Sequence, residues 1–186
     1  MHPDAETLLA EYPDIKMVEA FITDCNGAAR GKWLPIEKLS ALLSAGIKLP
    51  KSAIAQDAWG RDVPSVALDN GDIDGWCQAI PGSLKPVLGS HSVDQAQVVL
   101  TMFKDNGSPL LSDPRQVLAH VTQALETKGF YPRVAIELEF NLFDRQTAGQ
   151  SLRDALPAPH QTGGNLYGLT ALDGHQALLE ALRHYF

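Results

Sequence analysis

Residues 15–34, read I-K-M-V-E-A-F-I-T-D-C-N-G-A-A-R-G-K-W-L, predict the sheet on which the fold begins. Residues 15–23 alternate between apolar and polar well enough for a strand. Asp24-Cys25-Asn26-Gly27 follows, and an Asn-Gly pair favours the positive φ values of a tight hairpin turn. Residues 29–34 then form the return strand. The stretch therefore predicts a β-hairpin.

The next segments extend this hairpin into a small α+β unit. Pro35 stands where a helix can begin, and Gly46 ends a helical stripe made by Ile36, Leu39, Leu42 and Leu43. Further short segments lie at residues 53–56 and 75–80, with a loop at 57–72 between them, and residues 96–104 predict a strand. A hairpin, a crossing helix and further strands are typical of a β-grasp domain, which we place at residues 15–106. A short helix within residues 1–14 precedes it.

A second region begins after a linker at residues 107–112. Asp113 is a helix N-cap, Pro114 takes the first helical position, and Gln116 stands where a capping box needs it. The apolar stripe of this helix consists of Val117, Leu118, Val121 and Leu125. Gly129 is a natural C-terminal stop.

Residues 134–143, V-A-I-E-L-E-F-N-L-F, alternate with period two and predict a strand. Glu137 and Glu139 share one face and lie roughly 6.6 Å apart along such a strand. Two like charges on one face repel each other unless a cation lies between them. The pattern alone leaves two interpretations open, a cation site and a solvated acidic face.

Residues 144–171 form a long stretch rich in Pro, Gly, Gln, Asn and Thr, and Asp173 and Gln176 then mark the start of a last helix. A helix, a strand, a loop and a helix cannot close a sheet, because a lone strand leaves both edges unpaired. We therefore expect residues 113–186 to be the incomplete beginning of a larger domain.

Composition excludes several functions. The 186 residues carry 15 basic and 22 acidic side chains, a net charge of −7, which argues against a nucleic-acid surface. No apolar run is long enough to span a membrane, and the acidic start lacks the basic region of a signal peptide. Cys25 and Cys77 fit no zinc or redox spacing, so we expect two free thiols in the cytoplasm.

Six stretches in the same order resemble the glutamine synthetase superfamily, and most of all the bacterial γ-glutamylputrescine (γ-glutamylpolyamine) synthetases. They cover nearly the whole chain: D-C-N-G-A-A-R-G-K-W-L-P at 24–35, A-I-A-Q-D-A-W-G at 53–60, I-P-G-S-L-K-P at 80–86, V-L-T-M-F-K-D-N-G-S-P at 99–109, D-P-R-Q-V-L at 113–118 and V-A-I-E-L-E-F-N-L-F-D-R-Q at 134–146.

The resemblance implies a β-grasp domain followed by the start of a catalytic domain, in a homo-oligomer of stacked rings whose active sites lie between neighbouring subunits. It implies a ligase that phosphorylates the γ-carboxylate of L-glutamate with ATP and then displaces the phosphate with an amine. Two divalent cations, Mg²⁺ or Mn²⁺, hold the phosphates. By the family's E-x-E pattern, Glu137 and Glu139 each serve one of the two metals. No residue of this chain is expected to bind the nucleotide itself.

Asp57 resembles the acidic residue that the β-grasp domain presents to the amine site of the neighbouring subunit. Ammonia-using members carry D-G-S-S here, whereas this chain has D-A-W-G, which argues against ammonia as the natural substrate. The alternative for Asp57 is a carboxylate that caps a turn before Gly60. For Arg30 and Lys32, which match the family's R-G-K, we favour a role in the hairpin.

The sequence thus predicts the N-terminal part of an ATP-dependent ligase that joins L-glutamate to putrescine or another polyamine. The alternatives are a glutamine synthetase that uses ammonia and a non-catalytic β-grasp assembly module. We expect the 186-residue chain alone to be inactive. A further pair of glutamates and a basic, Gly-rich stretch beyond Phe186 would favour the enzyme.

Overall fold

A computed structural model describes residues 1–64, 71–87, 94–140 and 169–185. Internal contacts divide the chain into two compact units, Met1–Pro132 and Arg133–Phe186, and each is described by itself. The domain boundary that we place at residues 107–112 stays a prediction. Among the described residues no helix is both long enough and apolar enough to cross a membrane.

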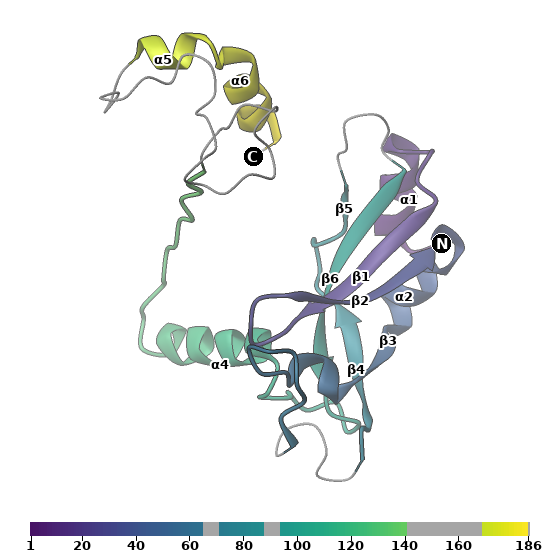
Figure 1. The fold of residues 1–186 in the computed structure, drawn as a ribbon. Coiled ribbons are helices and arrows are strands. Elements are labelled where there is room, and N and C mark those ends of the chain that lie inside the picture. The colour runs from purple at the N-terminus through teal and green to yellow at the C-terminus, as the bar shows by residue number, and fades with distance from the viewer. Residues whose placement is uncertain (65–70, 88–93, 141–168, 186) are drawn as a thin grey trace. The chain divides into compact units, whose positions relative to one another are not determined.

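The first unit is built around a mixed six-stranded sheet (Figure 1). Its strands run in the order β2-β1-β6-β4-β3, and β5 pairs with β6 outside this path. The bounds are Met17–Thr23 for β1, Ala29–Pro35 for β2, Ile47–Pro50 for β3, Asp74–Ala79 for β4, Lys85–Pro86 for β5 and Gln95–Phe103 for β6. The predicted hairpin is thus confirmed as β1 and β2, with Met17 opposite Pro35 and Thr23 opposite Ala29.

Strand β6 is the centre of the sheet. It pairs parallel with β1 as far as Val99, opposite Phe21, and antiparallel with β4 from Leu100 onward. Strand β3 pairs antiparallel with β4 at the edge. The four-residue β3 has no counterpart in our sequence prediction, because so short a segment carries no readable alternation.

Helices cover one face of this sheet (Figure 1). They are α1, Pro3–Glu11, and α2, Leu39–Ala45, which follows the short 3₁₀ helix η1, Ile36–Lys38; a second 3₁₀ helix, η2, covers Lys51–Ile54. Every second residue of β1 and β6 is buried against the helices, which is the reason for their alternating sequence. The core consists of Ala5, Leu8, Ile15, Val18, Ala20, Ile22, Leu39, Leu42, Leu49, Ile54, Cys77, Ala96, Val98, Leu100 and Met102. The predicted α+β class is confirmed.

Helix α4, Pro114–Glu126, begins at a buried N-cap. Asp113 Oδ1 accepts the Arg115 N–H at 2.8 Å, as predicted. The predicted capping box is wrong, since the Gln116 side chain donates to Thr101 Oγ1 at 3.0 Å and the Asp113 N–H donates to the Leu110 carbonyl. Gln116 is buried against β6, where its amide reaches the hydroxyl of Thr101.

The second unit corrects two further predictions. Residues 134–140 form no strand, and Val134, Ile136 and Leu138 are 87%, 84% and 66% exposed. A strand exists only where a neighbouring strand takes its N–H and C=O groups, and none is paired with these residues in the described part of the unit. Residues 141–143 of the predicted strand lie outside the described residues, as does most of the predicted loop at 144–171.

The last helix is divided in two, α5 at Thr170–Asp173 and α6 at Gln176–Tyr185. Asp173 therefore ends one helix instead of capping the next. The Gln176 amide donates to Glu180 Oε1 at 3.0 Å, one turn further along α6, so it closes no capping box.

Candidate functional site

The loop that carries Asp57 is a tight, self-contained turn. Asp57 Oδ1 accepts the N–H groups of Trp59 at 2.8 Å and Arg61 at 3.0 Å. The Asp57 N–H donates to the Arg61 carbonyl at 2.8 Å, and Gly60 has a φ of +78°, which favours glycine. The turn-capping role that we left open for Asp57 is therefore present in the structure.

Arg61 closes the same loop with its side chain. Its Nε and Nη2 both lie 2.8 Å from Asp57 Oδ2. The guanidinium also lies over the Trp59 ring, 5.1 Å from the ring centroid, a cation–π contact. Trp59 itself is 80% exposed. The loop thus displays an indole and a guanidinium, while its carboxylate is fully occupied by its own chain.

The charge state of Asp57 follows from these contacts. The Arg61 backbone N–H lowers the pKa of the Asp57 carboxyl more than partial burial raises it, and the Arg61 side chain and the Trp59 N–H lower it further. Asp57 is therefore a carboxylate at neutral pH.

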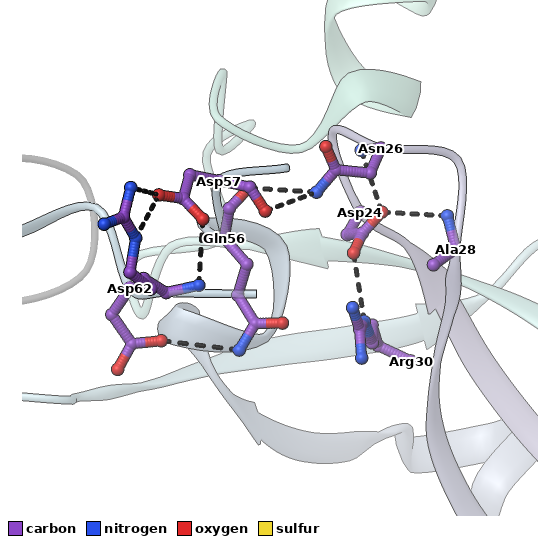
Figure 2. A network of polar contacts seen from close by, with 8 residues as sticks. Asp24, Asn26, Ala28, Arg30, Gln56, Asp57 and Asp62 are labelled. Atoms are coloured by element: carbon purple, nitrogen blue, oxygen red, sulfur yellow. Dashed lines mark hydrogen bonds and ion pairs between the residues drawn. The ribbon is translucent and has the colours of Figure 1, made fainter. Parts of the chain in front are cut away.

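The hairpin turn between β1 and β2 holds this loop in place (Figure 2). Asn26 Nδ2 donates to the carbonyls of Gln56 at 3.0 Å and Asp57 at 3.2 Å. On the far side, Gln56 forms an isolated β-bridge with Asp62. Two segments about thirty residues apart in sequence are thereby joined through one amide side chain.

Asp24 organises the hairpin turn itself (Figure 2). Its buried carboxylate accepts the N–H groups of Asn26 at 2.9 Å and Ala28 at 2.8 Å, and the Arg30 Nε at 3.0 Å. Burial raises the pKa of Asp24, but the Ala28 N–H and Arg30 outweigh it, and the pKa is lowered overall. Lys32 donates from Nζ to the Lys48 carbonyl at 3.3 Å. Arg30 therefore makes a hairpin contact, as we favoured from the sequence, whereas Lys32 reaches out of the hairpin to β3.

Glu137 and Glu139 lie in the exposed segment of residues 131–140 of the chain, which has neither helix nor strand. Among the residues that the structure describes, no three Asp, Glu, His or Cys side chains gather closely enough to hold a metal ion. The two glutamates and Asp57 fall in different compact units, Arg133–Phe186 and Met1–Pro132.

A hollow of about 530 Å³ lies beside the Asp57 loop, bounded by Cys25, Gln56, Val63, Leu111 and Val117. Its surface is mostly apolar, and the side chains around it include no charged group. Apart from the Cys25 thiol, it offers no acid, base or metal ligand.

Sequence reasoning missed Arg61. Its spacing from Asp57, i and i+4, indicates an ion pair only on a helix, and residues 57–61 form a turn. No sequence motif predicts an ion pair inside a loop, so the Asp57–Arg61 pair is recognisable only from the structure of the turn.

Comparisons with known proteins point to one family. Residues 111–186 match the model of the glutamine synthetase catalytic domain. The chain is 37% identical over 145 residues to gamma-glutamylputrescine synthetase PuuA of Escherichia coli (strain K12), which covers 77% of this chain and 30% of that protein.

Solved structures share the fold. A complex of GmaS with ADP matches with a TM-score of 0.54 at 19% identity, over 69% of this chain and 26% of that one. A glutamine synthase homolog matches with a TM-score of 0.53 at 20% identity, over 61% of this chain and 27% of that one. The chain spans less than a third of the length of each of these relatives.

Proposed function

This chain belongs to the glutamine synthetase superfamily, and from that premise we propose that its protein is an ATP-dependent ligase that joins the γ-carboxylate of L-glutamate to an amine. The observation that carries the proposal is the 37% identity to gamma-glutamylputrescine synthetase PuuA over 77% of the chain. The amine that this relative's name suggests is putrescine, so the substrate that we propose is putrescine or another polyamine.

The proposed reaction has two displacements. A γ-carboxylate oxygen of glutamate attacks the γ-phosphorus of ATP, and ADP leaves. The amine nitrogen then attacks the carbonyl carbon of γ-glutamyl phosphate, inorganic phosphate leaves, and the nitrogen loses a proton. Asp57, as a carboxylate, would attract the cationic amine and help to take up that proton.

Glu137 and Glu139 are the residues that we propose for the metal site. Both are exposed carboxylates, the hard oxygen donors that Mg²⁺ and Mn²⁺ prefer, and one residue separates them, so the donor set fits. Bound there, the two cations would neutralise charge on the transferring phosphoryl group. Each glutamate would supply only one carboxylate to one cation, so each cation needs further ligands. Because Glu137 and Glu139 alone do not supply them, we expect the 186-residue chain alone to be inactive.

Strand order supports the β-grasp assignment. A hairpin, β1 and β2, is followed by a helix and by strands that bring β6 parallel to β1 at the centre of the sheet. We propose that this β-grasp domain presents the Asp57 loop to the active site of a neighbouring subunit in a ring-shaped homo-oligomer. The cytoplasm, where Cys25 and Cys77 stay reduced, is the proposed location.

The test is ADP release by the protein expressed from its complete reading frame, with L-glutamate, ATP, Mg²⁺ and one amine at a time. Release that depends on putrescine, and that Glu139→Ala abolishes, supports the proposal. Glu126→Ala, an exposed glutamate at the end of α4, is the matched control. Release with ammonium alone would instead identify a glutamine synthetase. Absence of release with every amine would contradict the ligase.

A further inference from the structure

The Asp57 carboxylate has no acceptor site left for a substrate. A carboxylate offers about four lone-pair positions. The N–H groups of Trp59 and Arg61 take two at Oδ1, and the Nε and Nη2 of Arg61 take two at Oδ2. An amine can therefore bind Asp57 only where one of these donors leaves.

Arg61 is the donor that can leave. Its side chain is 72% exposed, and a solvent-exposed ion pair contributes little to stability. The contacts that shape the turn are made by backbone groups, namely the N–H groups of Trp59 and Arg61 and the Arg61 carbonyl. The loop therefore keeps its form when the guanidinium moves away.

The place that the guanidinium takes is a site for a cation. There, the Arg61 Nη2 lies 2.8 Å from the Asp57 carboxylate oxygen Oδ2, and the Arg61 Cζ lies 5.1 Å from the centroid of the exposed Trp59 ring. Carboxylate and aromatic face together are the groups that bind alkylammonium ions.

We propose that Arg61 blocks the amine site: its guanidinium occupies the position between Asp57 and Trp59 until an amine cation replaces it. This inference rests on the proposed function, in which Asp57 faces the amine. A bare ammonium ion supplies only charge and hydrogen bonds in exchange for the guanidinium. An alkylammonium ion also lays its carbon chain along the Trp59 ring, and this apolar contact favours the exchange. Because the guanidinium must leave for either cation, Arg61 weakens the binding of both by the same factor, and the preference for amines with a carbon chain comes from the Trp59 face.

The experiment measures amine binding by the 186-residue chain directly. Putrescine dihydrochloride and ammonium chloride are titrated separately at constant ionic strength, and the Trp59 indole N–H and the Gly60 amide are followed by NMR. Four variants are compared with the wild type: Arg61→Gln, Arg61→Lys, Asp57→Asn and Lys104→Gln. Lys104 is an exposed lysine in the turn after β6 and controls for the loss of one positive charge.

Arg61→Gln should bind both amines about twofold to fivefold more tightly, which is the gain expected when an exposed competing ion pair is removed. The gain should be the same factor for ammonium and putrescine, because both displace the same ion pair, so the preference for putrescine should stay unchanged. Arg61→Lys should lie between Arg61→Gln and the wild type, Lys104→Gln should match the wild type, and Asp57→Asn should lose the binding.

Equal affinities in the wild type and Arg61→Gln would overturn the inference, as would an equal gain in Lys104→Gln or an absence of amine binding in every variant. The ligase assay is independent of this readout. A ligase whose Arg61→Gln variant binds amines like the wild type would contradict the role of Arg61 alone. A gain in amine binding by a protein that releases no ADP would contradict the ligase alone.

Discussion

Asp113 and Met102 join helix α4 to the sheet, because Asp113 Oδ2 accepts the Met102 backbone N–H at 2.6 Å. Strand β1 pairs with β6 only as far as Val99, so Met102 lies beyond the region that β1 pairs. The Asp113 carboxylate accepts the N–H that β1 no longer reaches. The same oxygen accepts the Thr101 hydroxyl at 2.9 Å, while Oδ1 caps α4. One buried side chain thus fixes where the helix leaves the sheet.

Asp113→Asn should destabilise the first unit by about 1–3 kcal/mol. An amide has one oxygen and one NH₂ group, so one of the N–H donors of Met102 and Arg115 would face another donor. The free energy of unfolding is measured by urea denaturation with tryptophan fluorescence, which reports on this unit because all three tryptophans, Trp33, Trp59 and Trp76, lie in it. Asp105→Asn, in the exposed turn after β6, is the control and should change the unfolding free energy by less than about 0.5 kcal/mol. Equal stability of the two variants would contradict the role of Asp113.

Gly31→Ala should destabilise the hairpin by about 1–3 kcal/mol through overpacking. A Cβ on Gly31 would overlap the carbonyl oxygen of Ala20 and come within 2.7 Å of the Phe21 Cα, and these backbone atoms belong to the paired strand β1. The same denaturation measurement applies. Ala29→Ser, at an exposed position of β2, should leave the midpoint nearly unchanged, and a Gly31→Ala midpoint at the wild-type value would rule out the steric argument.

The hairpin of β1 and β2 and the end of α2 could be predicted from the sequence, because neighbouring residues decide both. The alternation before Asp24 and the Asn26-Gly27 pair favour a hairpin through neighbouring residues alone. Helix α2 ends at Gly46, whose φ of +71° is a conformation that favours glycine. Residues 134–140 alternate just as clearly, yet form no strand, because pairing must come from another segment.

Individual side-chain contacts, in the fold and in the candidate site, divide in the same way. The N-cap position of Asp113 was predictable from the residues that follow it, whereas its bond to Met102 depends on where β1 stops pairing with β6. Arg61 was not predictable, since its partner is decided by the path of a tight turn and not by a repeat.

Asp24 should give the unfolding free energy a dependence on acid pH. Its folded-state pKa lies below the ordinary 3.8, because the N–H groups and Arg30 that favour the carboxylate outweigh its burial. The stabilisation is therefore complete well above pH 3.8 and is lost as the pH falls through the folded-state pKa. Asp24→Asn should be less stable than the wild type by about 1–3 kcal/mol at pH 7, and the difference should narrow below pH 3.8.

Urea denaturation at several pH values between about 2 and 7 checks this expectation. Asp14→Asn, which removes one exposed carboxylate near the start of β1, corrects for the change in net charge. A stability difference that stays constant down to the lowest pH would show that Asp24 contributes by packing and not by charge.

The two cysteines should differ sharply in their reaction with a thiol reagent. Cys77 is completely buried in β4, and burial, with a smaller contribution from the charge of Asp113, raises its pKa to about 12. Because the thiolate is the reactive form, Cys77 should stay unmodified in the folded protein from neutral pH to about pH 10. Cys25 is exposed in the hairpin turn, so one equivalent of 5,5′-dithiobis(2-nitrobenzoic acid) should react in the native state and two in urea. Cys25→Ser should abolish the native-state reaction while leaving one equivalent in urea. Rapid native-state modification of Cys25→Ser would mean that β4 opens to solvent far more often than its burial implies.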